Sequence, residues 1–144
     1  MRFNEILNRL PFAKPFLFVD EIHHVNDQGA SGSFTFHKEM EFFKGHFVNE
    51  PIVPGSILTE TMAQIGGACL GIYLILNDRE NDGKVYVATS YAVDFYLPVF
   101  PDERVTVTSE KIYARFGKLK YNAIAKNMNN EIVAQGVFSG MLKS

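Results

Sequence analysis

The sequence predicts an α+β fold in which a curved antiparallel β-sheet is wrapped around one long central α-helix. Three observations carry this prediction: a single helical stretch that is apolar on nearly every side, strand patterns before and after it, and turn residues that join the last strands. A helix that is hydrophobic all round has to be buried over most of its surface. A sheet that covers the helix meets this requirement within one core.

The central helix is predicted over residues 55–77. Pro54 stands where proline begins a helix without cost, and Asn77-Asp78 ends the apolar pattern. The longest uncharged apolar stretch, residues 61–76, is shorter than the roughly 18–20 residues that a membrane-spanning helix needs, and Gln64 interrupts it. We therefore expect the buried helix of a cytosolic protein.

Strand patterns lie on both sides of this helix. Before it, residues 4–10 suit a short amphipathic helix, residues 16–25 and 30–36 suit strands joined by a turn, and residues 41–54 lack periodicity and suit a loop. After it, four strands are predicted at residues 84–95, 104–116, 118–127 and 131–141. Gly117 and Asn129-Asn130 supply turns, which makes the last three strands an antiparallel meander.

Composition narrows the function classes. The 144 residues fit one domain, which we expect to span residues 1–144. The formal net charge of −2 leaves no broad cationic field for nucleic acid. The only cysteine, Cys69, has no partner for an intramolecular disulfide, which suits a reducing compartment. No signal-peptide pattern opens the chain, so we expect a cytoplasmic protein that does not insert into membranes.

One face of the predicted helix combines polar and small residues: Ser56, Glu60, Gln64, Gly67 and Gly71. This face either meets solvent, with Glu60 as an ordinary surface acid, or it lines a cavity. No Lys or Arg accompanies Glu60 before Arg79, whereas exposed faces usually carry several charges. Helical glycines cost roughly 1 kcal/mol each relative to alanine, which indicates that they permit a close approach. We favour close packing as the reason for these glycines. The group that approaches the helix could be a strand, a partner helix or an acyl chain.

His46 lies in the irregular segment just before the helix. A histidine in a loop is often a surface or capping residue. Here it precedes the first free N–H groups of a helix, which are suited to stabilise a developing negative charge. A base, N–H donors and an acid between residues 46 and 60 suit an elimination next to a carbonyl group.

Residues 45–64, GHFVNEPIVPGSILTETMAQ, resemble the signature of the 3-hydroxyacyl-acyl-carrier-protein dehydratases of FabZ type, approximately GHFPxxPIMPGVLxxExMAQ. Residues 10–11 and 15–20 are similar to the family's LPHRYPFLLVD, and a weaker similarity runs from Phe95 to Asp102. The resemblance implies a hot-dog fold, a homodimer or a trimer of dimers, and neither a metal nor an organic cofactor. It also implies dehydration of (3R)-3-hydroxyacyl thioesters to trans-2-enoyl thioesters.

The same resemblance implies the roles of four residues. His46 matches the catalytic histidine, the general base on C2, and Glu60 matches the carboxylate that helps the hydroxyl group leave. Gly55 matches the glycine whose N–H polarises the thioester carbonyl, and Gln64 matches a residue that holds the carboxylate. In the family, the histidine and the carboxylate of one site come from different subunits.

Two departures from the family pattern concern the partner. Residues 12–14 (FAK) replace a His-Arg-Tyr segment, and residues 94–103 (DFYLPVFPDE) replace a basic RFKRPVVPGD segment. Acyl carrier proteins are acidic, so basic residues attract them. The sequence therefore leaves two thioester carriers as alternatives. One is an acyl carrier protein, including one of a specialised lipid or polyene pathway, and the other is coenzyme A. The basic residues that could compensate, or simply be solvated charges, are Lys14, Lys38, Lys44, Arg115 and Lys118.

Two other functions suit the same fold: an acyl thioesterase acting on coenzyme A or carrier-protein thioesters, and a non-catalytic acyl-binding subunit. The presence of both His46 and Glu60 favours the dehydratase. The adjacent His23 and His24 point to opposite faces of a strand, so they and His37 are not expected to bind metal. We expect an inert core thiol at Cys69 and a structural carboxylate at Asp20. Four aromatic residues either line an acyl tunnel or fill the core: Phe42, Phe43, Phe47 and Phe95.

Overall fold

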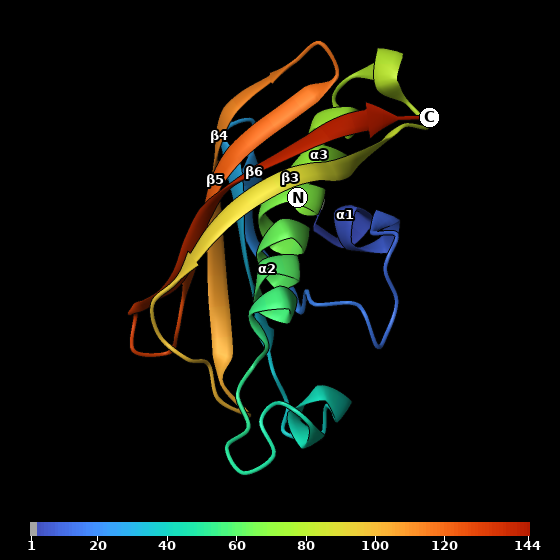
Figure 1. The fold of residues 1–144 in the computed structure, drawn as a ribbon. Coiled ribbons are helices and arrows are strands. Elements are labelled where there is room, and N and C mark those ends of the chain that lie inside the picture. Colours follow the sequence, from blue (N-terminus) through green and yellow to red (C-terminus); the bar gives the residue numbers. More distant parts are fainter. Residues whose placement is uncertain (1–2) are drawn as a thin grey trace.

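A computed structural model describes residues 3–144 and shows a six-stranded antiparallel sheet curved around one helix (Figure 1). The strands follow the spatial order β1-β2-β4-β5-β6-β3. Their bounds are β1 Glu21–Asn26, β2 Gly29–Thr35, β3 Val85–Phe95, β4 Arg104–Arg115, β5 Lys118–Lys126 and β6 Ile132–Lys143. The predicted meander of the last three strands is confirmed, because β5 pairs with both β4 and β6. β1 and β3 form the two edges of the sheet.

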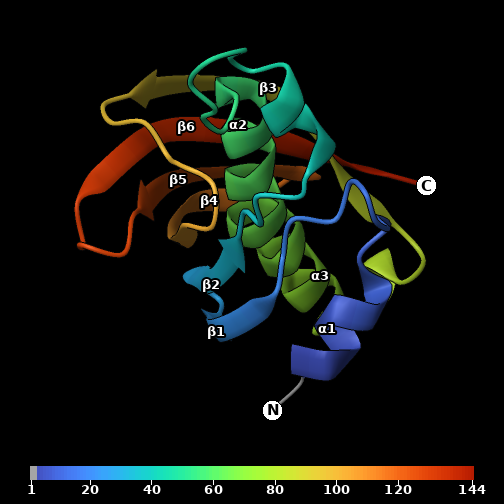
Figure 2. The same ribbon diagram turned by 90° about the horizontal axis from the view of Figure 1, so that it is seen from below.

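The central helix consists of α2 (Gly55–Ala63), a π-helical turn η2 (Gln64–Ala68) and α3 (Cys69–Leu76). The predicted helix is confirmed to within one residue at its end, but the π turn was not predicted. The continuous helix has 22 residues and is long and apolar enough to cross a membrane by composition. However, 61% of its 18-residue apolar window is buried inside the chain, and the sheet wraps around the helix, as Figure 2 shows. It is the core helix of the fold.

The core lies between the helix and the concave face of the sheet. Alternate residues of β4 and β5 point inward: Val105, Val107, Leu119, Ala123 and Ala125 are all at most 2% exposed. Met62, Ile65 and Leu70 of the helix pack against them as part of one buried cluster. The N-terminal helix α1 (Phe3–Arg9) lies on the other side of the core helix, away from the sheet, and buries Ile6 (Figures 1 and 2).

The strand predicted over residues 16–25 is wrong in its first part, because β1 begins at Glu21. The backbone of the preceding segment is held by the core helix. The Gln64 side chain accepts a hydrogen bond from the Phe18 N–H over 2.8 Å and donates one to the Phe16 carbonyl over 3.0 Å. The segment therefore covers the helix and does not extend the sheet. Within the predicted loop of residues 41–54, a short 3-10 turn, η1 (Glu41–Lys44), was also missed.

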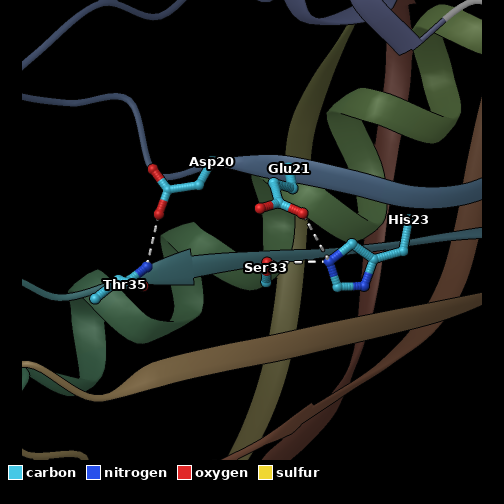
Figure 3. A network of polar contacts seen from close by, with 5 residues as sticks. All are labelled: Asp20, Glu21, His23, Ser33 and Thr35. Atoms are coloured by element: carbon cyan, nitrogen blue, oxygen red, sulfur yellow. Dashed lines mark hydrogen bonds and ion pairs between the residues drawn. The ribbon is translucent and has the colours of Figure 1, made fainter.

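Polar contacts join β1 to β2 at the edge of the sheet (Figure 3). A carboxylate oxygen of Asp20 accepts a hydrogen bond from the Thr35 N–H over 2.8 Å, which agrees with a structural role. The His23 Nε2 atom lies 3.1 Å from the Ser33 hydroxyl and 3.8 Å from a Glu21 carboxylate oxygen. The first two of these contacts tie Asp20 and β1 to β2.

Candidate active site

Glu60 lies on the second turn of α2 and faces a cavity between the core helix and the sheet. The cavity measures about 90 Å³, and the Glu60 side chain in its wall is half-buried. β3, β5 and β6 supply the opposite wall, including Tyr86, Tyr121 and Ser139. Glu60 is therefore placed in a cavity wall and not on a fully solvent-exposed face.

Gln64 holds the Glu60 carboxyl group from one turn further along the helix. Its Nε2 atom donates to a Glu60 carboxylate oxygen over 3.0 Å and also to the Phe16 carbonyl. Its Oε1 atom accepts from the Phe18 N–H, and the side chain is 0% exposed. Every polar end of this amide is thus used, which fixes its orientation. Within residues 3–144, no Lys or Arg pairs with Glu60.

The helix glycines permit side chains of the sheet to approach closely. A Cβ atom at Gly67 would overlap the hydroxyl of Tyr121, and one at Gly71 would lie 2.8 Å from the ring of Tyr86. The Ser109 hydroxyl, on β4, donates to the Gly66 carbonyl over 2.8 Å, within the π turn. Of the alternatives left open by the sequence, the structure shows an approach by strand side chains. π turns of this kind are frequent at functional sites.

His46 lies in the connection between η1 and α2, half-buried, with its ring stacked on that of Phe47 at 4.1 Å between centroids. Its Nδ1 atom lies 3.3 Å from the carbonyl oxygen of Ile52. A carbonyl can only accept, so this contact requires the proton on Nδ1 and leaves Nε2 with a free lone pair in the neutral ring. Such a nitrogen can act as a base.

A second cavity, of about 390 Å³, opens beside His46 and the start of α2, where Gly55 lies. The first N–H groups of a helix have no acceptor within it, so they are free to bind a ligand oxygen. A Cβ atom at Gly55 would lie 3.1 Å from the Phe95 ring, which shows how closely the end of β3 covers the helix start. A larger residue at position 55 would displace this ring.

The two cavities share no residue, so the single chain does not bring His46 and Glu60 into one site. Both cavities adjoin the edge strand β3. Residues 86–88, near its beginning, line the Glu60 cavity, and Phe95, at its end, lines the His46 cavity. The resemblance had implied a site shared between subunits, and the geometry of one chain is compatible with that arrangement.

The remaining candidate residues occupy varied positions. Cys69 is fully buried, and burial raises the pKa of its thiol to about 12, which suits an inert core residue. Phe43 is buried, whereas Phe47 and Phe95 are 55% and 51% exposed.

Among residues 3–144, one group has the ligand atoms of a metal site within 4.8 Å of one another. It consists of His37, Glu39 and Asp102, all exposed, and it includes neither His23 nor His24. The sequence also left Tyr121 unnoticed as a cavity residue. As one of several alternating inward residues of a strand, it carries no local signal of its own.

Comparison with known proteins gives the family. Residues 10–136 match the FabA-like domain. A 3-hydroxyacyl-[acyl-carrier-protein] dehydratase FabZ from Chlamydia trachomatis serovar L2 is 33% identical, and the match covers 96% of this chain and 90% of that relative. The enzyme of the same name from Acinetobacter baumannii is 32% identical, over 87% of this chain and 85% of the relative. The family match contains all four residues of the motif, His46, Gly55, Glu60 and Gln64.

Solved structures give the fold. A hypothetical thioesterase from Streptococcus pneumoniae, solved with coenzyme A, has a TM-score of 0.68 at 14% identity, covering 86% of this chain and 85% of that one. The protein smu.793 from Streptococcus mutans, bound to acetyl CoA, has a TM-score of 0.71 at 11% identity, covering 95% and 98%. At these identities the likeness concerns the fold alone, and the predicted hot-dog fold is confirmed. Motif, fold and family together show that the chain belongs to the FabA-like family and is a dehydratase of FabZ type.

Proposed function

We propose that this protein removes water from (3R)-3-hydroxyacyl thioesters to form trans-2-enoyl thioesters, with His46 as the base and Glu60 as the acid. The FabZ relatives are named for dehydrating 3-hydroxyacyl groups on acyl carrier protein. For this chain, the observation that carries the proposal is the position of His46 and Glu60 in two cavities near opposite ends of one edge strand, β3.

A homodimer would complete the site. In the described part of the chain β3 pairs only with β6, so the hydrogen-bonding groups along its other side are available to a further strand. Its residues Val87, Tyr91 and Phe95 are exposed and apolar or aromatic. If two copies pair β3 antiparallel about a two-fold axis, the Phe95 end of one strand meets the beginning of the other. His46 of one subunit then approaches Glu60 of the partner subunit.

The chemistry follows from the groups at this junction. The free Nε2 of His46 takes the proton on C2, and the N–H groups at the start of α2, with Gly55, stabilise negative charge on the thioester oxygen. Glu60, held by Gln64, gives a proton to the C3 hydroxyl. The C3–O bond breaks, C2 and C3 become doubly bonded, and water leaves. The base gains one proton and the acid loses one, so exchange with solvent resets the site.

The carrier proposed for the substrate is an acyl carrier protein, as in the names of the relatives. The segment of residues 94–103 holds no Lys or Arg and exposes Tyr96, Leu97 and Phe100. A carrier with an apolar contact surface, such as one from a specialised pathway, suits this segment. Coenzyme A is the alternative, since the structural neighbours include proteins solved with coenzyme A and acetyl CoA.

A thioesterase is the second candidate function, because a structural neighbour is described as one. Purified protein incubated with 3-hydroxyacyl thioesters of graded length, on carrier protein and on coenzyme A, separates the alternatives by mass spectrometry. We expect loss of one water with the thioester intact. Release of the free acid would identify a hydrolase, and unchanged substrate throughout the series would identify a non-catalytic subunit.

Hybrid dimers test whether the site crosses the subunit boundary. We expect a His46→Ala chain combined with a Glu60→Gln chain to recover roughly half the wild-type turnover per dimer, because one of the two sites is then intact. Two affinity tags and tandem purification isolate the hybrid. Its matched control pairs a wild-type chain with the double variant.

The control should be nearly inactive, since each crossed site would then contain one altered group. Sites contained within single chains would reverse this result: the control would be half active and the first hybrid inactive. A cytoplasmic location, a single domain over residues 1–144 and a trimer of dimers stay predictions. Light scattering of the purified protein measures the last of these.

A further inference from the structure

Tyr121, on β5, brings a hydroxyl group to the cavity that holds Glu60. Its side chain is 5% exposed, and the cavity wall also contains Gln64 and Gly67. The hydroxyl lies where Gly67 leaves room on the helix, since a Cβ atom there would overlap it. Gly67 follows Gln64 by three positions, so the hydroxyl meets the same side of the helix as the Glu60–Gln64 pair.

The position of this hydroxyl is well defined. The Tyr121 ring stacks on that of Phe138, with 5.3 Å between centroids and 7° between planes. All buried side-chain polar atoms within residues 3–144 have a hydrogen-bond partner, whereas the Tyr121 hydroxyl makes no such bond in that part of the chain. The hydroxyl is therefore not sealed in the core. It is open to the cavity and keeps both its donor and its acceptor capacity.

The Gln64 side chain has no free hydrogen-bond donor to offer a molecule in the cavity. Both Nε2 protons are used, by Glu60 and by the Phe16 carbonyl, and Oε1 already accepts from Phe18. Glu60 can give one proton to a departing hydroxyl group, but the resulting water then needs a further partner in a largely apolar cavity. A buried polar group without a partner is unfavourable by roughly 1–3 kcal/mol. The Tyr121 hydroxyl lines the same cavity and is free to form this hydrogen bond.

We propose that the Tyr121 hydroxyl hydrogen-bonds the C3 oxygen of the substrate as it leaves, and so acts beside Glu60 on the leaving-group side of the reaction. This rests on the proposed function. Tyr121 does not change its protonation state: the proton on the departing oxygen comes from Glu60, the C2 proton goes to His46, and Tyr121 only orients and stabilises the water that forms.

The electrostatics of the cavity agree with this role. Burial, and secondly the nearby charge of Glu60, raise the pKa of the Tyr121 hydroxyl above its usual value. Tyr121 therefore keeps its proton at neutral pH and remains a donor. Glu60 and Tyr121 both line the same cavity.

The Tyr121→Phe variant tests the proposal because it removes one oxygen and keeps the ring that stacks on Phe138. We expect kcat to fall roughly tenfold, the size of one lost hydrogen bond to the reacting oxygen, with KM changed less than about twofold. The unfolding midpoint should stay near the wild-type value, because the hydroxyl has no hydrogen-bond partner to lose among residues 3–144. Tyr113→Phe, on β4 and in neither cavity wall, is the matched control and should keep wild-type kinetics.

The possible outcomes distinguish the role of Tyr121 from the proposed dehydratase function. A Tyr121→Phe enzyme with wild-type kcat, or with a raised KM and unchanged kcat, would overturn the role of Tyr121 while leaving the dehydratase intact. An equal loss in Tyr113→Phe would trace the effect to general perturbation of the sheet and would also overturn it. A wild-type protein that removes no water from any substrate in the series would overturn the proposed function itself, and this inference with it.

Discussion

The His46→Ala variant is expected to fold normally and to lose roughly 10²–10⁴-fold in turnover, the usual contribution of a positioned general base. The loss should appear mainly in kcat, because the imidazole accepts the C2 proton in the transition state and contributes little to substrate binding. Folding should be affected only slightly. The half-buried ring stacks on the exposed Phe47, and its 3.3 Å contact with the Ile52 carbonyl is worth about 1 kcal/mol or less.

Steady-state kinetics on the carrier-linked substrate, together with thermal unfolding, measure both expectations. His24→Ala is the matched control: His24 is an exposed histidine on β1 that contacts Asn26 and lies in neither cavity wall. It should retain full turnover. If the His46→Ala enzyme works at the wild-type rate, another group removes the C2 proton and the assignment of His46 is wrong.

The Glu60→Gln variant should lose activity on a similar scale while its stability stays equal or rises. The amide cannot donate the proton that the C3 oxygen requires, and loss of such a general acid again amounts to roughly 10²–10⁴-fold. The structure of the cavity should survive, because Gln64 Nε2 can donate to an amide oxygen as it does to the carboxylate. The amide carries no charge and has nearly the shape of the carboxyl group, so it adds no desolvation penalty in this half-buried site.

Kinetics and the unfolding midpoint of Glu60→Gln are compared with those of Glu110→Gln, an exposed acid on β4 that is absent from both cavity walls. The control should match the wild type in both measurements. Normal turnover by Glu60→Gln would remove the acid from the mechanism. A lost fold would instead identify Glu60 as a structural residue and contradict the cavity argument.

The elements with strong periodic patterns were predicted well. β4 and β5 alternate apolar and polar residues, and their expected bounds differ from the observed ones by one residue. The core helix was found because it is apolar on all sides. By contrast, residues 16–20 have the composition of a strand but lie along the helix, since their backbone groups bond to the Gln64 side chain. The π turn beginning at Gln64 was missed because no local sequence pattern distinguishes it from an α-helical turn.

For the candidate site, the order His46, Gly55, Glu60, Gln64 is a local property of one loop and one helix, and the sequence alone was sufficient to nominate these four residues. Helical spacing places Glu60 and Gln64 one turn apart, and their hydrogen bond follows from that spacing. The roles of the four residues, as distinct from their positions, are what the variants above test.

The sequence by itself determined the fold class, the core helix, the meander and the family motif, because each is recorded in residues close together along the chain. Only the tertiary structure decided that His46 and Glu60 occupy separate cavities near opposite ends of β3, and that Tyr121 lines the same cavity as Glu60. The physical reason is that hydrophobic burial is non-directional: a periodic pattern shows which side chains leave water, not which neighbours they meet. Those neighbours are set by strand order and register, which join residues far apart in sequence.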